Sequence, residues 1–183
     1  TMNNFALALR QQKKFSRAIE LLEQTLENGR STLGDDHPKT LVFLGNLAAT
    51  RKASGDKDKA ITLCEEWYQR SRAVLGEDHS ETLISLSYLA CYLAENGKIG
   101  SSMSHFEHLL SLKQARFGRE HPESIATIGH MAGYNAEDGN TSKSIPLYEE
   151  FLRLKQATLG IENAESISAM NDLANEYRVA GLF

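Results

Sequence analysis

The octapeptide Leu33-Gly-Asp-Asp-His-Pro-Lys-Thr40 decides the fold of this chain, because it occurs three more times. It returns as Leu75-Gly-Glu-Asp-His-Ser-Glu-Thr82, then as Phe117-Gly-Arg-Glu-His-Pro-Glu-Ser124, and with more changes as Leu159-Gly-Ile-Glu-Asn-Ala-Glu-Ser166. The copies begin at positions 33, 75, 117 and 159, a constant period of 42 residues. A fixed period of about 20–50 residues is typical of repeat arrays, in which neighbouring units bury a shared core. We therefore expect a recognition surface rather than a catalytic cleft.

The period divides the 183 residues into repeats at 1–39, 40–81, 82–123 and 124–165, with a partial repeat at 166–183. We expect one repeat domain over 1–183. The chain begins inside a helical pattern and ends with a repeat half built, so we also expect it to be a fragment of a longer protein.

The first half of each repeat has apolar residues at the spacing of one face of an α-helix. This stripe contains Leu41, Leu44, Leu47 and Ala48, then Leu83, Leu86, Leu89 and Ala90, then Ile125, Ile128, Met131 and Ala132, and finally Ile167, Met170, Leu173 and Ala174. Glycine just after a helix adopts the left-handed conformation without steric cost. Gly55, Gly97 and Gly139 therefore predict where these helices end, and Lys13 holds the same place in the first repeat.

The second half of each repeat predicts another helix. Its expected buried faces are Ala60, Leu63, Cys64 and Trp67, then Ser102, His105, Phe106 and Leu109, then Ser144, Leu147, Tyr148 and Phe151. One position of this helix has a small residue in all four repeats: Ala18, Ala60, Ser102 and Ser144. A small side chain at this place predicts a close approach between helices.

The repeated octapeptide is the expected loop between repeats. Its glycine ends the second helix, and Asp36 and Asp78 are expected to cap the next helix. Its histidines (His37, His79 and His121) fall in different repeats, whose helices stack about 10 Å apart. A shared metal requires nitrogen atoms about 2.0–2.1 Å from one ion. We therefore assign these histidines a structural role.

Composition excludes several function classes. The net charge is −4 and no run of lysine or arginine occurs, which argues against nucleic-acid binding. No apolar stretch approaches the roughly 20 residues needed to insert into a membrane, and no signal peptide opens the chain. Cys64 and Cys91 are expected to be free thiols, which suits a reducing compartment such as the cytoplasm.

No pattern predicts catalysis or a cofactor. The sequence has no glycine-rich phosphate loop, no zinc spacing and no nucleophile motif. His105 and His108 share a helix face, but a metal site needs a further ligand, so we interpret them as core or surface residues. We expect a protein that is not an enzyme.

Helix, glycine and helix, with a Leu-Ala pair in the first helix and a small residue in the second, resembles the tetratricopeptide repeat. The long period, the Leu-Gly-x-Asp-His-Pro-x-Thr loop and Asn46-Leu47-Ala48 resemble the long-helix repeats of kinesin light chains. The usual repeat has about 34 residues, and the additional eight add roughly two helical turns. The resemblance implies an all-α tetratricopeptide-type α-solenoid, a right-handed superhelix of antiparallel helix pairs.

The resemblance also implies a peptide-binding groove lined by the first helices, with an asparagine before the Leu-Ala pair that bonds the peptide backbone. Only Asn4 and Asn46 match that asparagine; Tyr88, His130 and Asp172 replace it. The expected groove residues are Asn3, Asn4, Asn46, Ala49, Lys52, Tyr88, Cys91, His130, Asn171 and Asn175. Small residues beside this line, such as Gly45, Gly129 and Gly133, are expected to leave room for a bound chain. Lys52 and Arg178 are the expected basic residues of the groove.

These residues predict a scaffold or adaptor that holds a protein or peptide segment of roughly ten residues through its backbone. Two alternatives stay open. The chain could be a structural subunit packed permanently in a larger assembly through its convex face and ends, or the sensor repeats of a multidomain signalling ATPase. The last helix has Ile167, Met170, Leu173 and Tyr177 on its stripe but no following helix in this sequence. We expect it either to associate with another chain or to expose an apolar patch.

Overall fold

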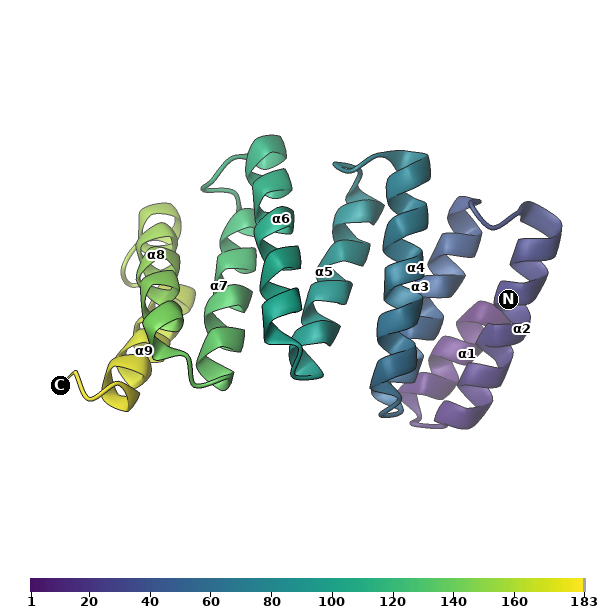
Figure 1. The fold of residues 1–183 in the computed structure, drawn as a ribbon, viewed down its shortest axis with the longest axis horizontal. Helices are drawn as coiled ribbons and strands as arrows, with labels where there is room; N and C mark the ends of the chain where they lie inside the picture. Colours follow the sequence, from purple (N-terminus) through teal and green to yellow (C-terminus); the bar gives the residue numbers. More distant parts are fainter. Residues whose placement is uncertain (183) are drawn as a thin grey trace. The chain divides into compact units, whose positions relative to one another are not determined.

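The computed structural model describes residues 1–182 and shows nine α-helices and no strand in that range, as the sequence predicts. The helices follow one another along the chain in the order shown in Figure 1. They are α1 (Met2–Gln11), α2 (Phe15–Leu33), α3 (Pro38–Ala53), α4 (Lys57–Leu75), α5 (Ser80–Glu95), α6 (Ile99–Phe117), α7 (Pro122–Glu137), α8 (Thr141–Leu159) and α9 (Ala164–Val179).

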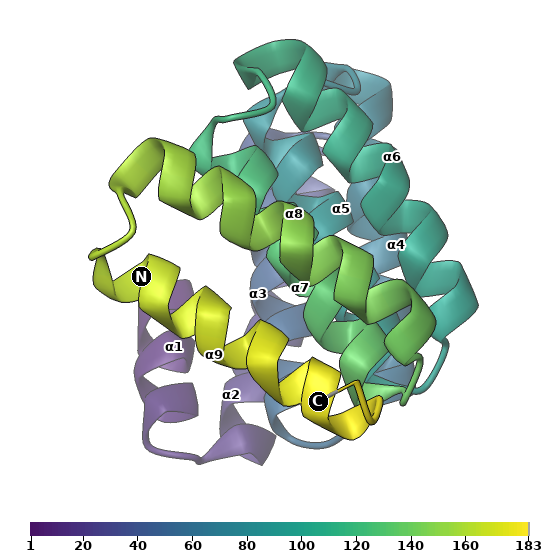
Figure 2. The same cartoon turned by 90° about the vertical axis from the view of Figure 1, so that its left-hand side faces the viewer.

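The helices form two compact units. The first unit is Thr1–Asn96, with α1 to α5, and the second begins at Gly97 and contains α6 to α9. Within each unit, helices that are consecutive in sequence pack against each other, as α8 and α9 do in Figure 2. Each unit therefore builds its core from neighbouring helices.

The 42-residue period recurs in the helix lengths. The first helices α3, α5, α7 and α9 have 16 residues each, and the second helices α2, α4, α6 and α8 have 19. The predicted glycines follow the first helices with positive φ, for example 91° at Gly55. Lys13 has the same left-handed conformation, with φ of 58°, although it has a side chain. The octapeptide and the glycines thus mark the helix ends as predicted.

The predicted small residues lie in the core. Ala18, Ala60, Ser102 and Ser144 are all fully buried. A larger side chain at any of these places would meet close-packed neighbours. The predicted buried faces of the second helices need correction, because Leu63, His105, Leu147, Tyr148 and Phe151 are only half-buried, whereas Ile61, Met103 and Leu154 are buried.

The loop histidines cap the first helices. Nδ1 of His37 accepts a hydrogen bond from the backbone N–H of Lys39 at 3.1 Å. Nδ1 of His79 and Nδ1 of His121 accept the same bond, at 3.2 Å, from the backbone N–H of the residue two positions later in the chain. Their structural role is thereby confirmed. The prediction that Asp36 and Asp78 cap the helices was wrong by one residue, because the extended backbone at His37 and His79 directs the imidazole over the first turn. Asp36 instead accepts a bond from Arg70 at 3.1 Å.

The last helix, α9, exposes part of its predicted apolar stripe. Ile167 and Met170 of α9 are 47% and 43% exposed. The residues one repeat earlier, Ile125 and Ile128 of α7, are buried against α8. Leu173, which faces the preceding helices, is buried in α9 as well. Two residues of the predicted stripe are therefore exposed on α9, which fits either expected outcome, and Phe183 lies outside the described residues.

Candidate functional site: hollows on the first helices

The first unit has a hollow of about 270 Å³ on the surface of its first helices, which we call the Trp67 hollow. It is lined by Arg10 of α1, Val42, Gly45, Asn46 and Ala49 of α3, Trp67 of α4, and Glu81, Ile84 and Tyr88 of α5. The period that aligns the first helices thus brings residues of three of them to one place.

The indole of Trp67 reaches this surface from the second helix α4 because Gly45 has no side chain. A Cβ atom at Gly45 would lie 3.0 Å from the indole ring. The indole Nε1 donates a hydrogen bond to Glu81 Oε1 at 3.1 Å. The ring centroid of Tyr88 lies 5.8 Å from that of Trp67. The indole is therefore held by both of the first helices beside it.

The prediction that Gly45 and Gly129 leave room for a bound chain was wrong. Both glycines leave room for an aromatic ring of the same chain. At Gly129 a Cβ atom would lie only 2.9 Å from the ring of Phe151. Gly133 differs, since a Cβ there would meet only the Tyr148 hydroxyl, at 3.8 Å. The sequence could show that these places are small but not which neighbour requires it.

The predicted asparagines do come together. Asn46 Nδ2 donates to Asn3 Oδ1 at 3.0 Å, and Asn3 Nδ2 donates to Asn4 Oδ1 at 3.4 Å. The first of these bonds joins α3 to α1 beside the Trp67 hollow. It uses one N–H of Asn46, so the other N–H and Oδ1 of this amide can still bond a ligand backbone.

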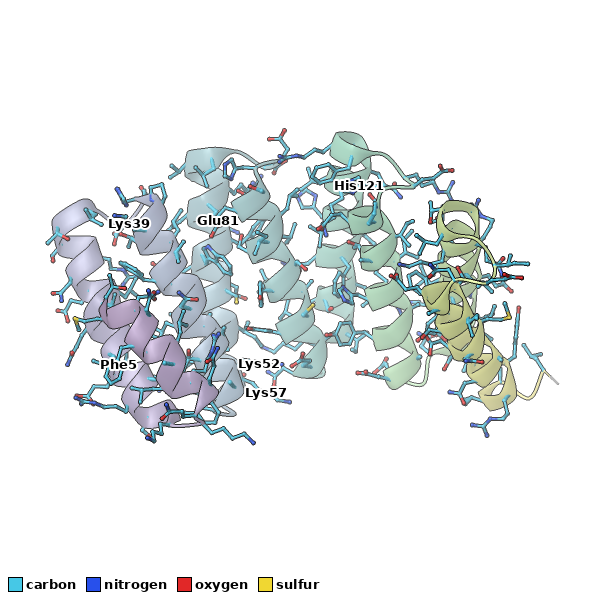
Figure 3. The ribbon with its side chains drawn as sticks, turned by 180° about the vertical axis from the view of Figure 1, so that it is seen from behind. Phe5, Lys39, Lys52, Lys57, Glu81 and His121 are labelled. Carbon is cyan, nitrogen blue, oxygen red and sulfur yellow. The ribbon has the colours of Figure 1, made fainter. Side chains whose placement is uncertain are left out.

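The predicted cation Lys52 is already paired within the first unit. Its ammonium lies 2.8 Å from Glu95 Oε2 and 5.7 Å from the centroid of the Tyr92 ring. Lys57, which lies near Lys52 in Figure 3, donates to the Glu95 carbonyl at 2.7 Å. The charge of Lys52 is therefore largely neutralised by its own neighbours.

Arg10 is the basic residue that the sequence reasoning missed. It lines the Trp67 hollow and forms no ion pair with any residue in the range 1–182. Its position is 42 residues before that of Lys52, so the period itself was the signal that could have identified it. Val42 and Ile84 were also missed, because they lie outside the predicted buried stripe.

Both cysteines are free thiols, as predicted. Cys64 is fully buried, and burial, together with Cys91 and Glu65, raises its pKa to about 12. A thiol with that pKa is protonated at neutral pH and is a poor nucleophile. Cys91 is half-buried on α5, and Ala49, at the same place in the previous repeat, lines the Trp67 hollow.

The second unit has a hollow of about 280 Å³, which we call the Phe151 hollow. It is lined by Ala126, Gly129 and His130 of α7, Tyr148, Phe151 and Lys155 of α8, and Asp172 of α9. The pKa of His130 is lowered by burial and, less strongly, by Lys113, so this ring is mostly neutral at pH 7. His130 therefore lines a hollow built like the first.

The predicted residues Asn171 and Asn175 are exposed on α9. Asn175 Oδ1 accepts a hydrogen bond from Arg178 at 2.8 Å. It is Asp172 of the same helix that lines the Phe151 hollow. Asp172 is the residue of α9 at the place of Asn46 and His130.

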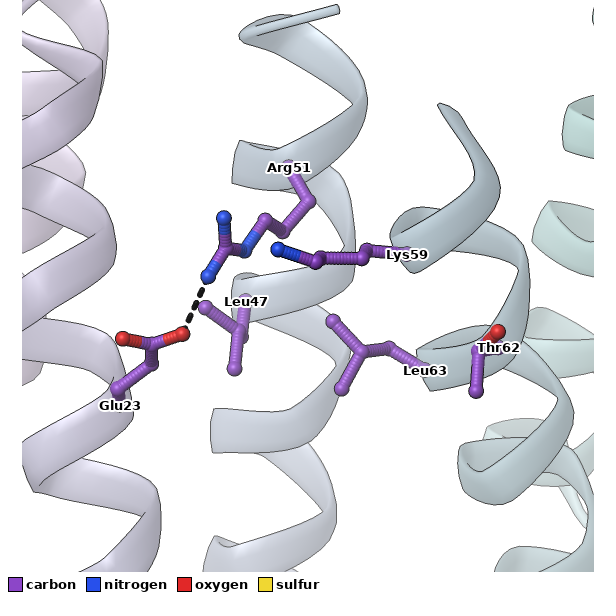
Figure 4. Close-up of a pocket in the computed structure, with 6 residues that line it drawn as sticks. All are labelled: Glu23, Leu47, Arg51, Lys59, Thr62 and Leu63. Carbon is purple, nitrogen blue, oxygen red and sulfur yellow. Dashed lines mark hydrogen bonds and ion pairs between the residues drawn. The ribbon is translucent and has the colours of Figure 1, made fainter. Parts of the chain in front are cut away.

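A third hollow, of about 300 Å³, lies between α2, α3 and α4 in the first unit. Figure 4 shows Leu47 and Leu63 in this hollow, with Arg51 directed at Glu23. Arg51 bonds Glu23 and also Asp56, the latter at 3.2 Å. The charged groups of this hollow are therefore satisfied by each other.

Residues 1–182 contain no group of three or more histidine, cysteine or acidic side chains that could hold a metal ion. None of the helices described is both long enough and apolar enough to cross a membrane.

The tetratricopeptide repeat profile matches residues 1–66 and 44–115, which together cover more than half of the chain. The chain belongs to the tetratricopeptide repeat family. Its all-α solenoid fold is similar to that of the nearly identical TPR-like repeats of a putative kinesin light chain from Podosopora anserina, with a TM-score of 0.87 and 24% identity over 99% of this chain and 86% of that chain. BtubC (BKLC) from P. vanneervenii has a TM-score of 0.82 and 16% identity over 98% of this chain and 72% of its own. No curated protein matches this tetratricopeptide repeat chain.

Proposed function

We propose that this chain is a non-catalytic scaffold or adaptor module that binds a protein or peptide segment along its first helices. The Trp67 hollow is the observation that carries the proposal. It combines an aromatic floor, two exposed aliphatic side chains, an amide and an unpaired arginine, which is the mixture typical of recognition sites. The free thiols suit a cytoplasmic setting.

The distribution of exposed apolar residues supports the first helices over the second. Val42, Ile84 and Tyr88 of α3 and α5 are 44%, 45% and 43% exposed and all line the Trp67 hollow. Large exposed apolar residues of the second helices lie near the ends of those helices, at Leu33, Val74, Phe117 and Leu159. A subunit packed permanently through its second helices would need an apolar patch along their length. The structural-subunit alternative therefore has less support.

A bound segment would place an apolar side chain between Val42 and Ile84, over the ring of Trp67. Its backbone would lie beside Asn46, whose amide offers both a donor and an acceptor. Tyr88, which also lines the hollow, presents an exposed ring and a hydroxyl group. Sensor repeats of a signalling ATPase could use the same hollow, and the sequence flanking this chain would distinguish that alternative.

The test starts from peptides selected on the unmodified protein from a random library displayed on phage. Selected peptides are titrated calorimetrically against the parent, Asn46→Ala and Tyr88→Ala, with Thr62→Ala and Glu27→Ala on the second helices as controls. We expect Asn46→Ala to weaken binding by about 0.5–1.5 kcal/mol, near the lower limit because its amide already bonds Asn3. Tyr88→Ala should weaken it further, and the controls should bind as the parent does. The reverse pattern would replace the proposal with the structural-subunit alternative.

A further inference from the structure

The Phe151 hollow contains one acidic group that is not neutralised. Asp172 lines the hollow, is exposed, and forms no ion pair or hydrogen bond with any other residue of 1–182 through its carboxylate. In the Trp67 hollow, by contrast, a cation and a carboxylate, Arg10 and Glu81, both line the surface without an ion pair, so their charges offset each other.

The lysines near the Phe151 hollow are both paired. Lys113 of α6 lies 2.8 Å from Glu123 of α7, and this contact lowers the pKa of Glu123. Lys155 of α8 lies 2.5 Å from Glu165 of α9. Two ion pairs therefore leave the charge of Asp172 uncompensated.

Other acidic groups add to the negative potential of the hollow. The pKa of Tyr148 is raised mainly by burial and then by Asp172, Glu176 and Glu137, so three carboxylates lie near its hydroxyl group. Glu176 is buried and accepts a hydrogen bond from Ser144 at 2.5 Å. The hollow is therefore an electronegative recess rather than a balanced one.

Aromatic rings in the hollow suit a cation as well. The ammonium of Lys155 lies 5.6 Å from the centroid of the Phe151 ring, so this ring already accepts a cation from the same chain. Tyr148 is a second ring that can do so. His130 is mostly neutral at pH 7 and adds no repelling charge. A positive group entering the recess would thus meet the Asp172 carboxylate and the Tyr148 ring, while Lys155 already lies over the Phe151 ring.

We propose that the Phe151 hollow binds a basic side chain, lysine or arginine, of the partner segment, with Asp172 as its counter-ion. This inference rests on the proposed function, since it assigns chemistry to one part of the bound segment. Asn46 and Tyr88, which test the proposed function, line the Trp67 hollow, so the two can fail separately.

The test is a nuclear magnetic resonance titration of the ¹⁵N-labelled full chain with acetylated Ala-Ala-Arg-Ala-Ala amide. The matched probe has citrulline, which is neutral and nearly isosteric, in place of arginine. We expect the arginine peptide to shift the amide signals around Gly129, Tyr148 and Asp172, and the citrulline peptide to leave them unchanged. Equal shifts with both probes, or arginine-specific shifts confined to other helices, would overturn the proposal.

Three variants assign the effect to charge. Asp172→Asn, at an exposed position, should weaken binding of the arginine peptide by about tenfold, as expected for losing a bond to a charged group. Glu162→Gln, an exposed loop carboxylate of the same unit, should have no effect. Lys155→Gln should strengthen binding, because it removes a positive charge and releases Glu165. Unchanged affinity in Asp172→Asn, or weaker binding in Lys155→Gln, would contradict the assignment of Asp172.

Discussion

The Trp67 hollow and the Phe151 hollow have the same frame but different free charges. Arg10 and Glu81 line the first without ion pairs, whereas Asp172 is the free charge of the second. In each, a glycine on a first helix makes room for an aromatic ring from the following second helix. In the first repeat the same two places hold Asn3 and Thr25, where no ring has to fit. The fit between a glycine on one helix and an aromatic ring on the next therefore sets the shape of each hollow. The polar residues around the ring set which ligand groups the hollow can bind.

The largest expected effect comes from removing the ring of the first hollow. Trp67→Ala leaves a cavity beneath Gly45 and breaks the bond to Glu81, and we expect it to lower the free energy of unfolding by about 3–5 kcal/mol. Phe151→Ala should cost less, because Phe151 is only half-buried. Denaturant unfolding of both variants measures the difference. Equal costs would contradict the expectation that burial sets the contribution of each ring.

The next largest expected loss of stability comes from enlarging a small residue where a second helix packs closely against its neighbours. Ala60 is fully buried, and Ala60→Leu should overpack its site and cost about 1–3 kcal/mol. Ala73→Leu, at an exposed place of the same helix α4, is the matched control and should be nearly neutral. Thermal unfolding compares them, and a melting curve of Ala60→Leu identical to that of the parent would rule out the close approach.

Two glycines of α7 test directly whether a glycine is needed to make room for the Phe151 ring. Gly129→Ala places a methyl group 2.9 Å from the Phe151 ring, whereas Gly133→Ala meets only the Tyr148 hydroxyl at 3.8 Å. Both gain helix propensity of about 1 kcal/mol, but only Gly129→Ala has to displace a ring. We expect Gly133→Ala to be more stable than Gly129→Ala by about 1–3 kcal/mol in chemical denaturation. If Gly129→Ala stabilises the protein as much as Gly133→Ala does, the glycine is not there for the ring.

The smallest effect concerns the caps, which the first helices of both hollows share. His79→Ala should cost about 0.5–2 kcal/mol, because the N–H of Glu81 loses its acceptor. His79→Asn should retain most of the stability, since Asn163 Oδ1 makes the same bond to Glu165 at 2.9 Å. The measurement is again the free energy of unfolding. A cost for asparagine equal to that for alanine would show that the imidazole has another role.

The fold could be predicted because its determinants are local and recur every 42 residues. The octapeptide, the glycines and the small residues each predict a helix end or a contact, and the structure confirms them. Histidine caps were missed, because the interpretation assumed that the preceding aspartate would accept the bond.

The candidate site was harder to predict, because it depends on pairs of residues from different helices. Gly45 and Trp67 fit each other only once α3 and α4 are packed. Lys52 has the expected place but not a free charge, because Glu95 pairs with it. Arg10 could have been found from the period alone. The sequence period thus predicts which residues line the candidate surface. Which of their charges stay free depends on ion pairs with residues of other helices.

Fluorescence of Trp67 tests the central claim, that binding takes place in the hollows of the first helices, most directly. Trp67 is the only tryptophan of the chain and forms the floor of the first hollow, so its emission reports that site alone. A peptide selected on the unmodified protein is titrated while emission and calorimetric heat are followed together. We expect the emission to change along the same saturation curve as the heat, because a bound side chain would contact the indole ring that lines the hollow. Saturable heat with unchanged Trp67 emission would contradict it.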